Sequence, residues 1–201
     1  TMKLLSKIAL ALAVAASFAS AEVGVGAHVG GSYNMLYNIP TEVASDDISG
    51  FGFSAGADFK LGLAMLQVVP GAYFAYETEC GDLDPAGEYC FAQTTLEVPV
   101  MARYSIIPML FVEAGPQFAF NISSTYEISG TGFSYADAES QDVEDASFME
   151  LGLSVGVGVD LPILPLTVDL KYTIGLTTLS DAEGADVKRM AIDLGVTYWF
   201  L

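Results

Sequence analysis

The single histidine of the chain, His28, is the residue with the most obvious catalytic chemistry. An imidazole can activate a serine hydroxyl or a water molecule for attack on an ester or peptide bond. His28 lies between Gly26 and Gly30 in an alternating segment, and Ser32 follows four residues later. Four residues of extended strand span about 13 Å, which is too far for a direct hydrogen bond between the two side chains. We therefore predict no catalytic residue and an inert His28 on an inward face.

Ionisable side chains recur on the small-residue face of the other alternating segments. Paired carboxylates could exchange protons or pass ions, but an interior too narrow for a substrate favours a structural salt-bridge network. Arg103 and Glu113 lie at similar depth on either side of a short link, and Lys171 can reach Asp169 or Asp193. The predicted network comprises Asp58, Lys60, Glu97, Arg103, Glu113, Glu150, Asp160, Asp169, Lys171 and Asp193. A proton or ion path through the same residues is the alternative.

Cys80 and Cys90 enclose a short stretch that contains Gly81, Pro85 and Gly87. In an exported chain we expect them to form a disulfide, which closes a loop of about ten residues and contributes up to roughly 2.7 kcal/mol. A metal pair would need further ligands that this stretch lacks. The acidic segments also lack the spacing of an EF-hand loop, so we predict no metal site and no cofactor.

The N-terminal residues have the pattern of a secretory signal peptide. Lys3 and Lys7 supply a basic region, an apolar run follows, and Ala19 and Ala21 are the small residues of a cleavage site. The run is shorter than the roughly 20 apolar residues that a membrane-spanning helix needs. We predict a cleaved signal peptide over residues 1–21, a mature domain over residues 22–201 and export through the periplasm.

The mature chain alternates with a period of two residues, which is typical of β-strands. From Met149 to Val159 the odd positions are all apolar, while the even positions hold small or charged residues. Similar alternation predicts eight strands, at 23–36, 50–62, 65–77, 92–105, 109–121, 149–160, 166–176 and 190–200. Pro70, Pro99 and Pro116 fall inside these segments, where each removes a hydrogen-bond donor, so we expect bulges or breaks in pairing there.

The links between the eight segments alternate in length. Those near 62–65, 105–109 and 161–166 are short, whereas those near 38–49, 78–91, 122–146 and 178–188 are long. An even number of strands places every long link at one end and both termini at the other. We therefore predict an all-β fold: an eight-stranded antiparallel up-and-down transmembrane β-barrel of the bacterial outer membrane, with short periplasmic turns and long extracellular loops.

The apolar face of this barrel is predicted to contact lipid. A soluble barrel carries Lys and Glu outside, whereas here the polar face is mainly Gly, Ser and Thr, which suits the crowded interior of eight strands. A closed barrel also pairs every backbone group, as hydrocarbon requires. Aromatic residues near the strand ends are interpreted as interfacial girdles, at Tyr33, Tyr37, Phe51, Phe53, Phe74, Tyr76, Phe91, Phe120 and Phe148 on the loop side and Tyr104, Tyr198 and Phe200 on the turn side.

Acidic residues are concentrated in the long links. The chain has 25 Asp and Glu against 7 Lys and Arg, a net charge of -18, and 17 of the acids fall in these links, Glu77 and Glu79 among them. Such a charge repels phosphate backbones and disfavours nucleic-acid binding. We interpret the links as solvated outside loops. Divalent cations shared with lipopolysaccharide phosphates are the functional alternative.

Several segments resemble the PorT-like family of outer-membrane β-barrels. Leu96–Tyr104 is similar to a strand of that family with a central proline, and Phe111–Pro116 is similar to the strand that follows. Gly156–Asp160, Leu170–Leu176 and Val196–Phe200 resemble its later strands. The resemblance covers roughly residues 23–201 and implies an eight-stranded outer-membrane barrel, but these motifs do not carry the secretion role of the family's namesake.

Together these observations predict a non-enzymatic outer-membrane protein with a plugged lumen, acting in envelope integrity or surface interaction. An accessory role in a protein secretion system and, less favoured, a small ion pore are the alternatives. The expected partners are outer-membrane lipid, lipopolysaccharide and the barrel-insertion machinery, and the sequence names no protein partner for the loops.

Overall fold

The computed structural model describes residues 22–38, 48–63, 65–83, 87–130, 141–142, 148–178 and 187–200. The predicted signal peptide, with Ala19 and Ala21, and most acids of the predicted loops lie outside these residues. Within the described ranges, no helix is long and apolar enough to cross a membrane.

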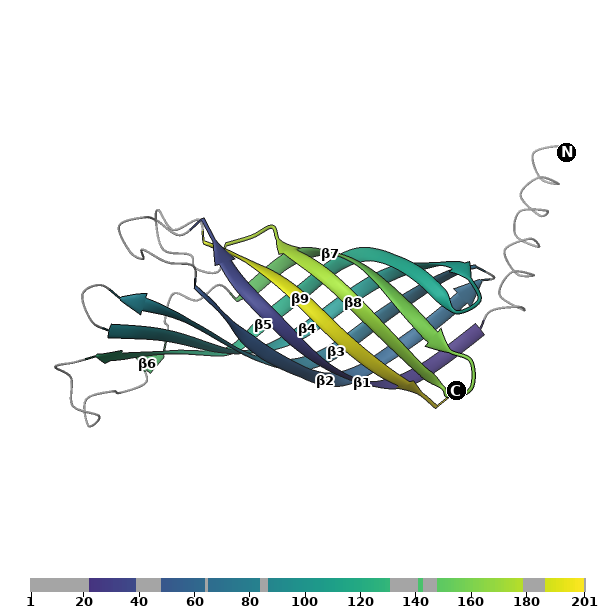
Figure 1. Ribbon diagram of the computed structural model, residues 1–201, viewed down its shortest axis with the longest axis horizontal. Helices are drawn as coiled ribbons and strands as arrows, with labels where there is room; N and C mark the ends of the chain where they lie inside the picture. The colour runs from purple at the N-terminus through teal and green to yellow at the C-terminus, as the bar shows by residue number, and fades with distance from the viewer. Residues whose placement is uncertain are drawn as a thin grey trace, which may run out of the picture.

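The described chain forms one antiparallel β-barrel (Figure 1). Its strands are β1 (Glu22–Tyr37), β2 (Ser49–Leu63), β3 (Leu66–Leu83), β4 (Gly87–Ile107), β5 (Leu110–Gly130), β7 (Met149–Leu161), β8 (Leu166–Gly175) and β9 (Lys188–Trp199). Strand β1 pairs with both β2 and β9, and β4 pairs with β5, so the sheet closes on itself. The two-residue β6 (Gln141–Asp142) pairs only with the outer part of β5. The predicted eight-stranded up-and-down barrel is confirmed.

Three neighbouring strands are longer than the alternation predicted. Strands β3, β4 and β5 run past the other strands at one end of the barrel and project as a three-stranded sheet (Figure 1). The β3–β4 ladder continues to the pair Leu83–Gly87, and the β4–β5 ladder continues to the pair Gly87–Gly130. The predictions of loops at 78–91 and 122–146 are therefore wrong for residues 78–83, 87–91 and 122–130. Many of these residues are polar and do not show apolar alternation, but pairing with a neighbouring strand runs through them.

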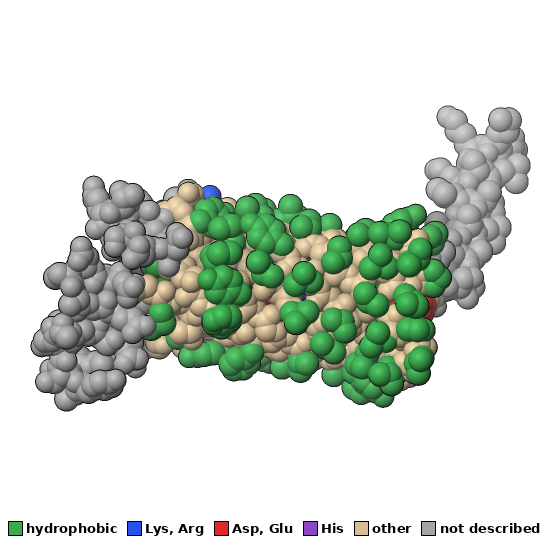
Figure 2. Space-filling view, in the orientation of Figure 1, with side chains coloured by type: hydrophobic (Ala, Val, Ile, Leu, Met, Phe, Trp, Pro, Cys, Tyr) green, Lys and Arg blue, Asp and Glu red, His purple; other side chains and the backbone are tan. Residues whose placement is uncertain are grey.

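The apolar face of the strands points outward. Leu153 and Ile192 are exposed, whereas Ser154 and Asp169, one residue from an outward position on β7 and β8, are buried inside. Figure 2 shows hydrophobic side chains spread over the wall of the barrel, with charged side chains visible only near its ends. Aromatic pairs lie toward both ends of the wall, including Tyr33 against Phe51 at 5.1 Å between ring centres and Tyr198 against Phe200 at 5.3 Å. This arrangement confirms the predicted facing.

The lumen is filled by side chains of very different sizes. Glycines lie beside larger residues of the neighbouring strand: a β-carbon at Gly158 on β7 would lie 2.2 Å from the ring of Phe111, its partner on β5. Phe111, Tyr73, Met101 and Trp199 are all buried. The predicted interior of mainly small residues is therefore incomplete. The small residues leave space that a few large side chains fill.

The three mid-strand prolines interrupt the hydrogen-bond ladders as expected. The β2–β3 pairing skips from Asp58–Gly71 to Leu61–Val68 around Pro70. The β3–β4 pairing skips from Pro70–Val100 to Tyr73–Glu97 beside Pro99, and the β4–β5 pairing skips from Pro99–Gln117 to Ala102–Ala114 beside Pro116. The breaks therefore lie next to one another on adjacent strands.

Candidate functional site

The lumen is the candidate site, since it holds the buried titratable groups of the described chain. At the turn end, Lys60 Nζ lies 2.7 Å from Glu22 Oε1 and 4.8 Å from the centre of the Trp199 ring. The Trp199 indole donates a hydrogen bond to Thr167 Oγ1 at 2.7 Å, and Thr167 donates to Asp160 Oδ1 at 2.5 Å. Lys60 thus stands at the mouth of the barrel with Glu22, apart from the interior network in which it was predicted.

The next layer inward surrounds His28. Its Nδ1 lies 3.0 Å from Thr197 Oγ1, which donates to Asp58 Oδ2 at 2.6 Å. The Tyr73 hydroxyl donates to the other oxygen of Asp58, and the Tyr73 ring stacks on the imidazole with 4.1 Å between ring centres. The adjoining cavity, lined in part by Ser54, has a volume of only about 10 Å³. No substrate fits beside this imidazole, because even one water needs about that volume.

The middle of the lumen holds two buried ion pairs. Arg103 Nε donates to Glu113 Oε2 at 2.6 Å, and the guanidinium lies 4.5 Å from the centre of the Phe111 ring. Lys171 Nζ lies 3.1 Å from Asp169 Oδ1. Asp193, opposite Lys171 in the β8–β9 ladder, accepts a hydrogen bond from Thr173 at 3.3 Å. The structure therefore places the predicted partners Arg103 and Glu113 together, and joins Lys171 to Asp169.

The layer nearest the loop end is organised by a residue absent from the predicted network, Arg189. Its guanidinium lies 2.8 Å from Glu77, 2.9 Å from Glu79 and 3.3 Å from Glu150, measured between the nearest nitrogen and oxygen atoms. It also donates to Gln93 Oε1 at 2.6 Å, while Gln93 Nε2 donates to Glu150 Oε1 at 3.0 Å. We call these five residues the Arg189 cluster. It joins β3, β4, β7 and β9 across the lumen.

Glu77 and Glu79 require a correction. They were predicted to be solvated loop residues, but Glu79 is fully buried and Glu77 is 4% exposed, both on the inward face of β3. The sequence does indicate their position, because Tyr73, Ala75, Glu77 and Glu79 are alternate residues of one strand and share its inward face. The parity of Ala191 and Asp193 on β9 likewise places Arg189 inside. The acidic side chains alone indicate a solvated loop. The guanidinium of Arg189 across the lumen compensates their charge and makes their burial possible.

The lumen as a whole is acidic and closely filled. Five carboxylates and three cationic side chains of the described chain are buried there, at Asp58, Glu77, Glu79, Glu113, Asp169, Arg103, Lys171 and Arg189. Glu97 lines two small cavities, one of about 10 Å³ beside His28 and Lys171 and one of about 40 Å³ beside the Arg189 cluster. Within the described residues, no three His, Cys, Asp or Glu side chains are arranged to hold a metal ion. The geometry can tie strands together across the barrel, and between these layers it leaves only water-sized spaces.

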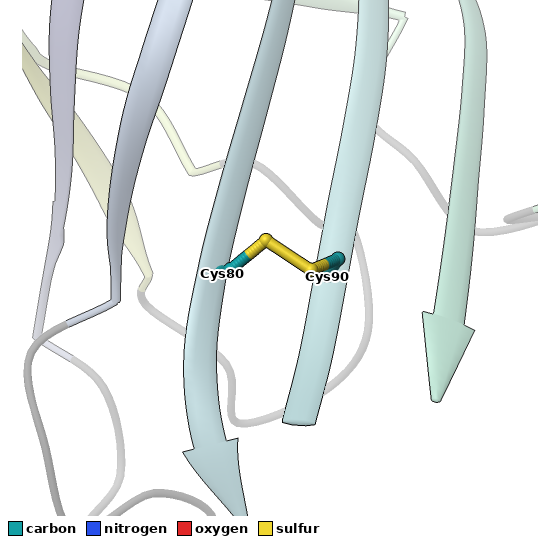
Figure 3. The surroundings of a disulfide bond; sticks show 2 residues. All are labelled: Cys80 and Cys90. Atoms are coloured by element: carbon teal, nitrogen blue, oxygen red, sulfur yellow. A yellow bond between two sulfur atoms is a disulfide. The ribbon is translucent and has the colours of Figure 1, made fainter. Parts of the chain in front are cut away.

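Outside the barrel wall, a disulfide joins Cys80 and Cys90 (Figure 3). The two residues lie directly opposite each other on β3 and β4, with 4.1 Å between their Cα atoms. They therefore cross-link the base of the projecting sheet, next to the buried Glu79.

A closed barrel with an apolar wall, a polar interior and long strands at one end is the architecture of bacterial outer-membrane proteins. The model of the family "Outer membrane protein beta-barrel domain" matches residues 15–181, and the chain belongs to this family. No curated protein matches the chain in sequence.

Comparison with solved structures finds similar chains at low sequence identity. Neisserial surface protein A (NspA) is 10% identical, with 89% of this chain and 98% of that chain covered and a TM-score of 0.58. Ail, the attachment invasion locus protein of Yersinia pestis, solved with the heparin analogue sucrose octasulfate, is 14% identical over 89% and 99% of the two chains, with a TM-score of 0.48. The protein is thus an outer-membrane β-barrel of the bacterial cell, with the NspA type of fold.

Proposed function

We propose that this protein is a non-catalytic barrel with a plugged lumen, which holds a rigid platform outside the cell for surface interaction. The observation that carries the proposal is the extension of β3, β4 and β5 beyond the barrel, cross-linked by Cys80 and Cys90. Ordering long paired strands costs more conformational entropy than ordering a short turn. A sheet that projects beyond the barrel despite this cost favours a binding role for the surface that it presents. The acidic residues of the predicted loops favour cationic partners, including divalent ions shared with lipopolysaccharide.

We also propose that the protein is exported through the periplasm and belongs to the PorT-like branch of its family. The signal pattern of residues 1–21 supports transport through the periplasm, where the barrel-insertion machinery would receive the chain. The motifs at 96–116 support a place within the PorT-like branch of the outer-membrane barrels.

The orientation can be tested with the native cysteines, both of which are in the disulfide. On intact cells we expect a membrane-impermeant maleimide to label the protein only after an impermeant reductant has opened Cys80–Cys90. The matched control is Ile163→Cys in a Cys80→Ala, Cys90→Ala background, because Ile163 is exposed on a turn at the opposite end. That variant should label only after the outer membrane is permeabilised. The reverse pattern would contradict an outward-facing platform.

The plug is tested by electrical recording. In planar bilayers we expect the purified, folded protein to give no steady current, since the Arg189 cluster crosses the lumen, the buried Arg103–Glu113 pair fills its middle, and the cavities beside them are water-sized. A channel-forming porin, incorporated in the same way, serves as the positive control. Steady conductance that scales with the number of inserted wild-type barrels would favour the ion-pore alternative instead.

A further inference from the structure

The turns of this barrel are apolar, although turns that face water are usually polar. No Asp, Glu, Lys or Arg occurs in residues 61–66, 104–112 or 161–168. The side chains are also exposed: Ile163 is 91% accessible, and Ile107 and Leu164 are each more than half accessible. Exposed apolar surface of this extent marks a site of contact with a membrane or another molecule.

These turns are continuous with the lipid-facing wall. Leu66, Leu110 and Leu161, the wall residues that adjoin the three turns, are themselves exposed. Phe200 and Tyr198 extend the same apolar rim along β9. The wall contacts hydrocarbon, so lipid of the leaflet on the turn side can reach the rim without crossing a polar belt.

The rim surrounds a cavity of about 950 Å³ at the mouth of the barrel. This volume lies in the range of small-molecule sites, and it is far larger than the cavities deeper in the lumen. Ile106, Leu164 and Phe200 contribute apolar lining, while Gln67 and Asp160 contribute polar groups. An apolar entrance with a few polar groups suits an amphiphile better than a sugar or an ion.

The cavity also contains one cation. The Lys60 side chain is 13% exposed and is held by Glu22, whose own side chain is 63% exposed. A pair with one partner so open to solvent is weak, so an anion entering the mouth can share the Lys60 ammonium with Glu22. Basic residues at membrane surfaces attract anionic lipid headgroups in this way.

We propose that the turn-end mouth binds a phospholipid from the adjoining leaflet, with an acyl chain in the cavity and the phosphate at Lys60. The bound lipid separates the plugged lumen from the periplasm. This site is independent of the surface platform at the other end of the barrel, so either proposal can fail alone.

The only tryptophan of the chain, Trp199, reports on this cavity directly. The full-length mature protein is folded into vesicles of phosphatidylglycerol carrying bromines at shallow acyl-chain positions, and into matched vesicles without bromine. We expect loss of most Trp199 emission in the brominated vesicles, together with weak quenching by aqueous acrylamide. Equal emission in both lipids, or efficient quenching by acrylamide, would overturn the proposal, since the mouth would then hold water or a non-lipid partner.

Two variants separate a lipid inside the mouth from lipid along the outer wall. Ile163→Asp places a charge on the rim at a side chain with little packing to lose, and should restore most of the emission in brominated vesicles. Phe148→Asp adds the same charge at the loop end, where Phe148 is also exposed, and should leave the quenching unchanged. Equal quenching in wild type and both folded variants would mean that wall lipid alone reaches Trp199 and would sink the proposal.

Discussion

Replacing Arg189 by methionine is expected to lower the free energy of unfolding by about 3–5 kcal/mol, the cost of stranding buried charges that have lost their partner. Methionine keeps most of the length of the side chain, so the loss reports charge and hydrogen bonding more than a cavity. The guanidinium contacts Glu77, Glu79 and Glu150, and the first two are almost inaccessible to water. Urea unfolding in lipid vesicles, followed by the heat-modifiable shift on gels, measures the change.

Lys60→Met is the matched control. It also removes a cation paired with a glutamate, but Glu22 lies at the mouth and is largely exposed, so a change within about 1 kcal/mol is expected. If both variants lose the same stability, the Arg189 cluster contributes no more than a surface pair, and a cross-lumen tie would be the wrong description.

Neutralising the stranded carboxylates should reverse the defect of Arg189→Met. Adding Glu77→Gln and Glu79→Gln removes the charge of the two most buried carboxylates, and Glu150, the third, is partly exposed and keeps the hydrogen bond from Gln93. Because most of the cost of Arg189→Met comes from stranded buried charge, the triple variant should recover most of the lost stability. Acidic buffer should act in the same direction, because protonation removes the same charge. A triple variant as unstable as Arg189→Met would show that lost packing is responsible instead.

Of two ion pairs in the lumen, one could be predicted from the sequence and the other could not. Arg103 and Glu113 flank a short turn, so antiparallel pairing alone places them opposite each other, as the ladder shows. Arg189 and Glu79 are 110 residues apart and lie on strands that are not neighbours. Their contact exists only because the barrel closes and its interior is narrow. Alternation predicts which face a residue occupies, but contacts across the lumen also require the stagger of the strands.

The end of β3 was also not predicted from the sequence. On β3, Tyr73 points inward while Phe74 and Tyr76 point outward, so apolar residues occupy both faces and the alternation is diluted. The acids that follow were then read as the start of a loop. On β7, where every outward position is apolar and inward ones are small or charged, the predicted and observed strands nearly coincide.

Replacing Gly115 by alanine is expected to destabilise the barrel by on the order of 3 kcal/mol, at the upper end of what overpacking costs. A β-carbon there would lie 2.0 Å from the carbonyl oxygen of Val100 and 2.9 Å from its carbon. The obstacle is backbone, and the β4–β5 ladder is already broken beside Pro116. The two strands would have to separate further, in a region where lipid offers no hydrogen bonds to the freed groups.

Gly31→Ala is the control that isolates this steric cause. Gly31 faces outward on β1, and an added β-carbon would come no closer than 3.8 Å to any neighbour, the carbonyl oxygen of Gly52. Alanine in a strand interior is favoured over glycine by roughly 0.5–1 kcal/mol, so this variant should be slightly more stable than the wild type. The same heat-modifiable assay compares the two variants. Wild-type stability of Gly115→Ala would mean that the strands beside the proline breaks yield easily, and that the close approach of Val100 to Gly115 does not constrain the barrel.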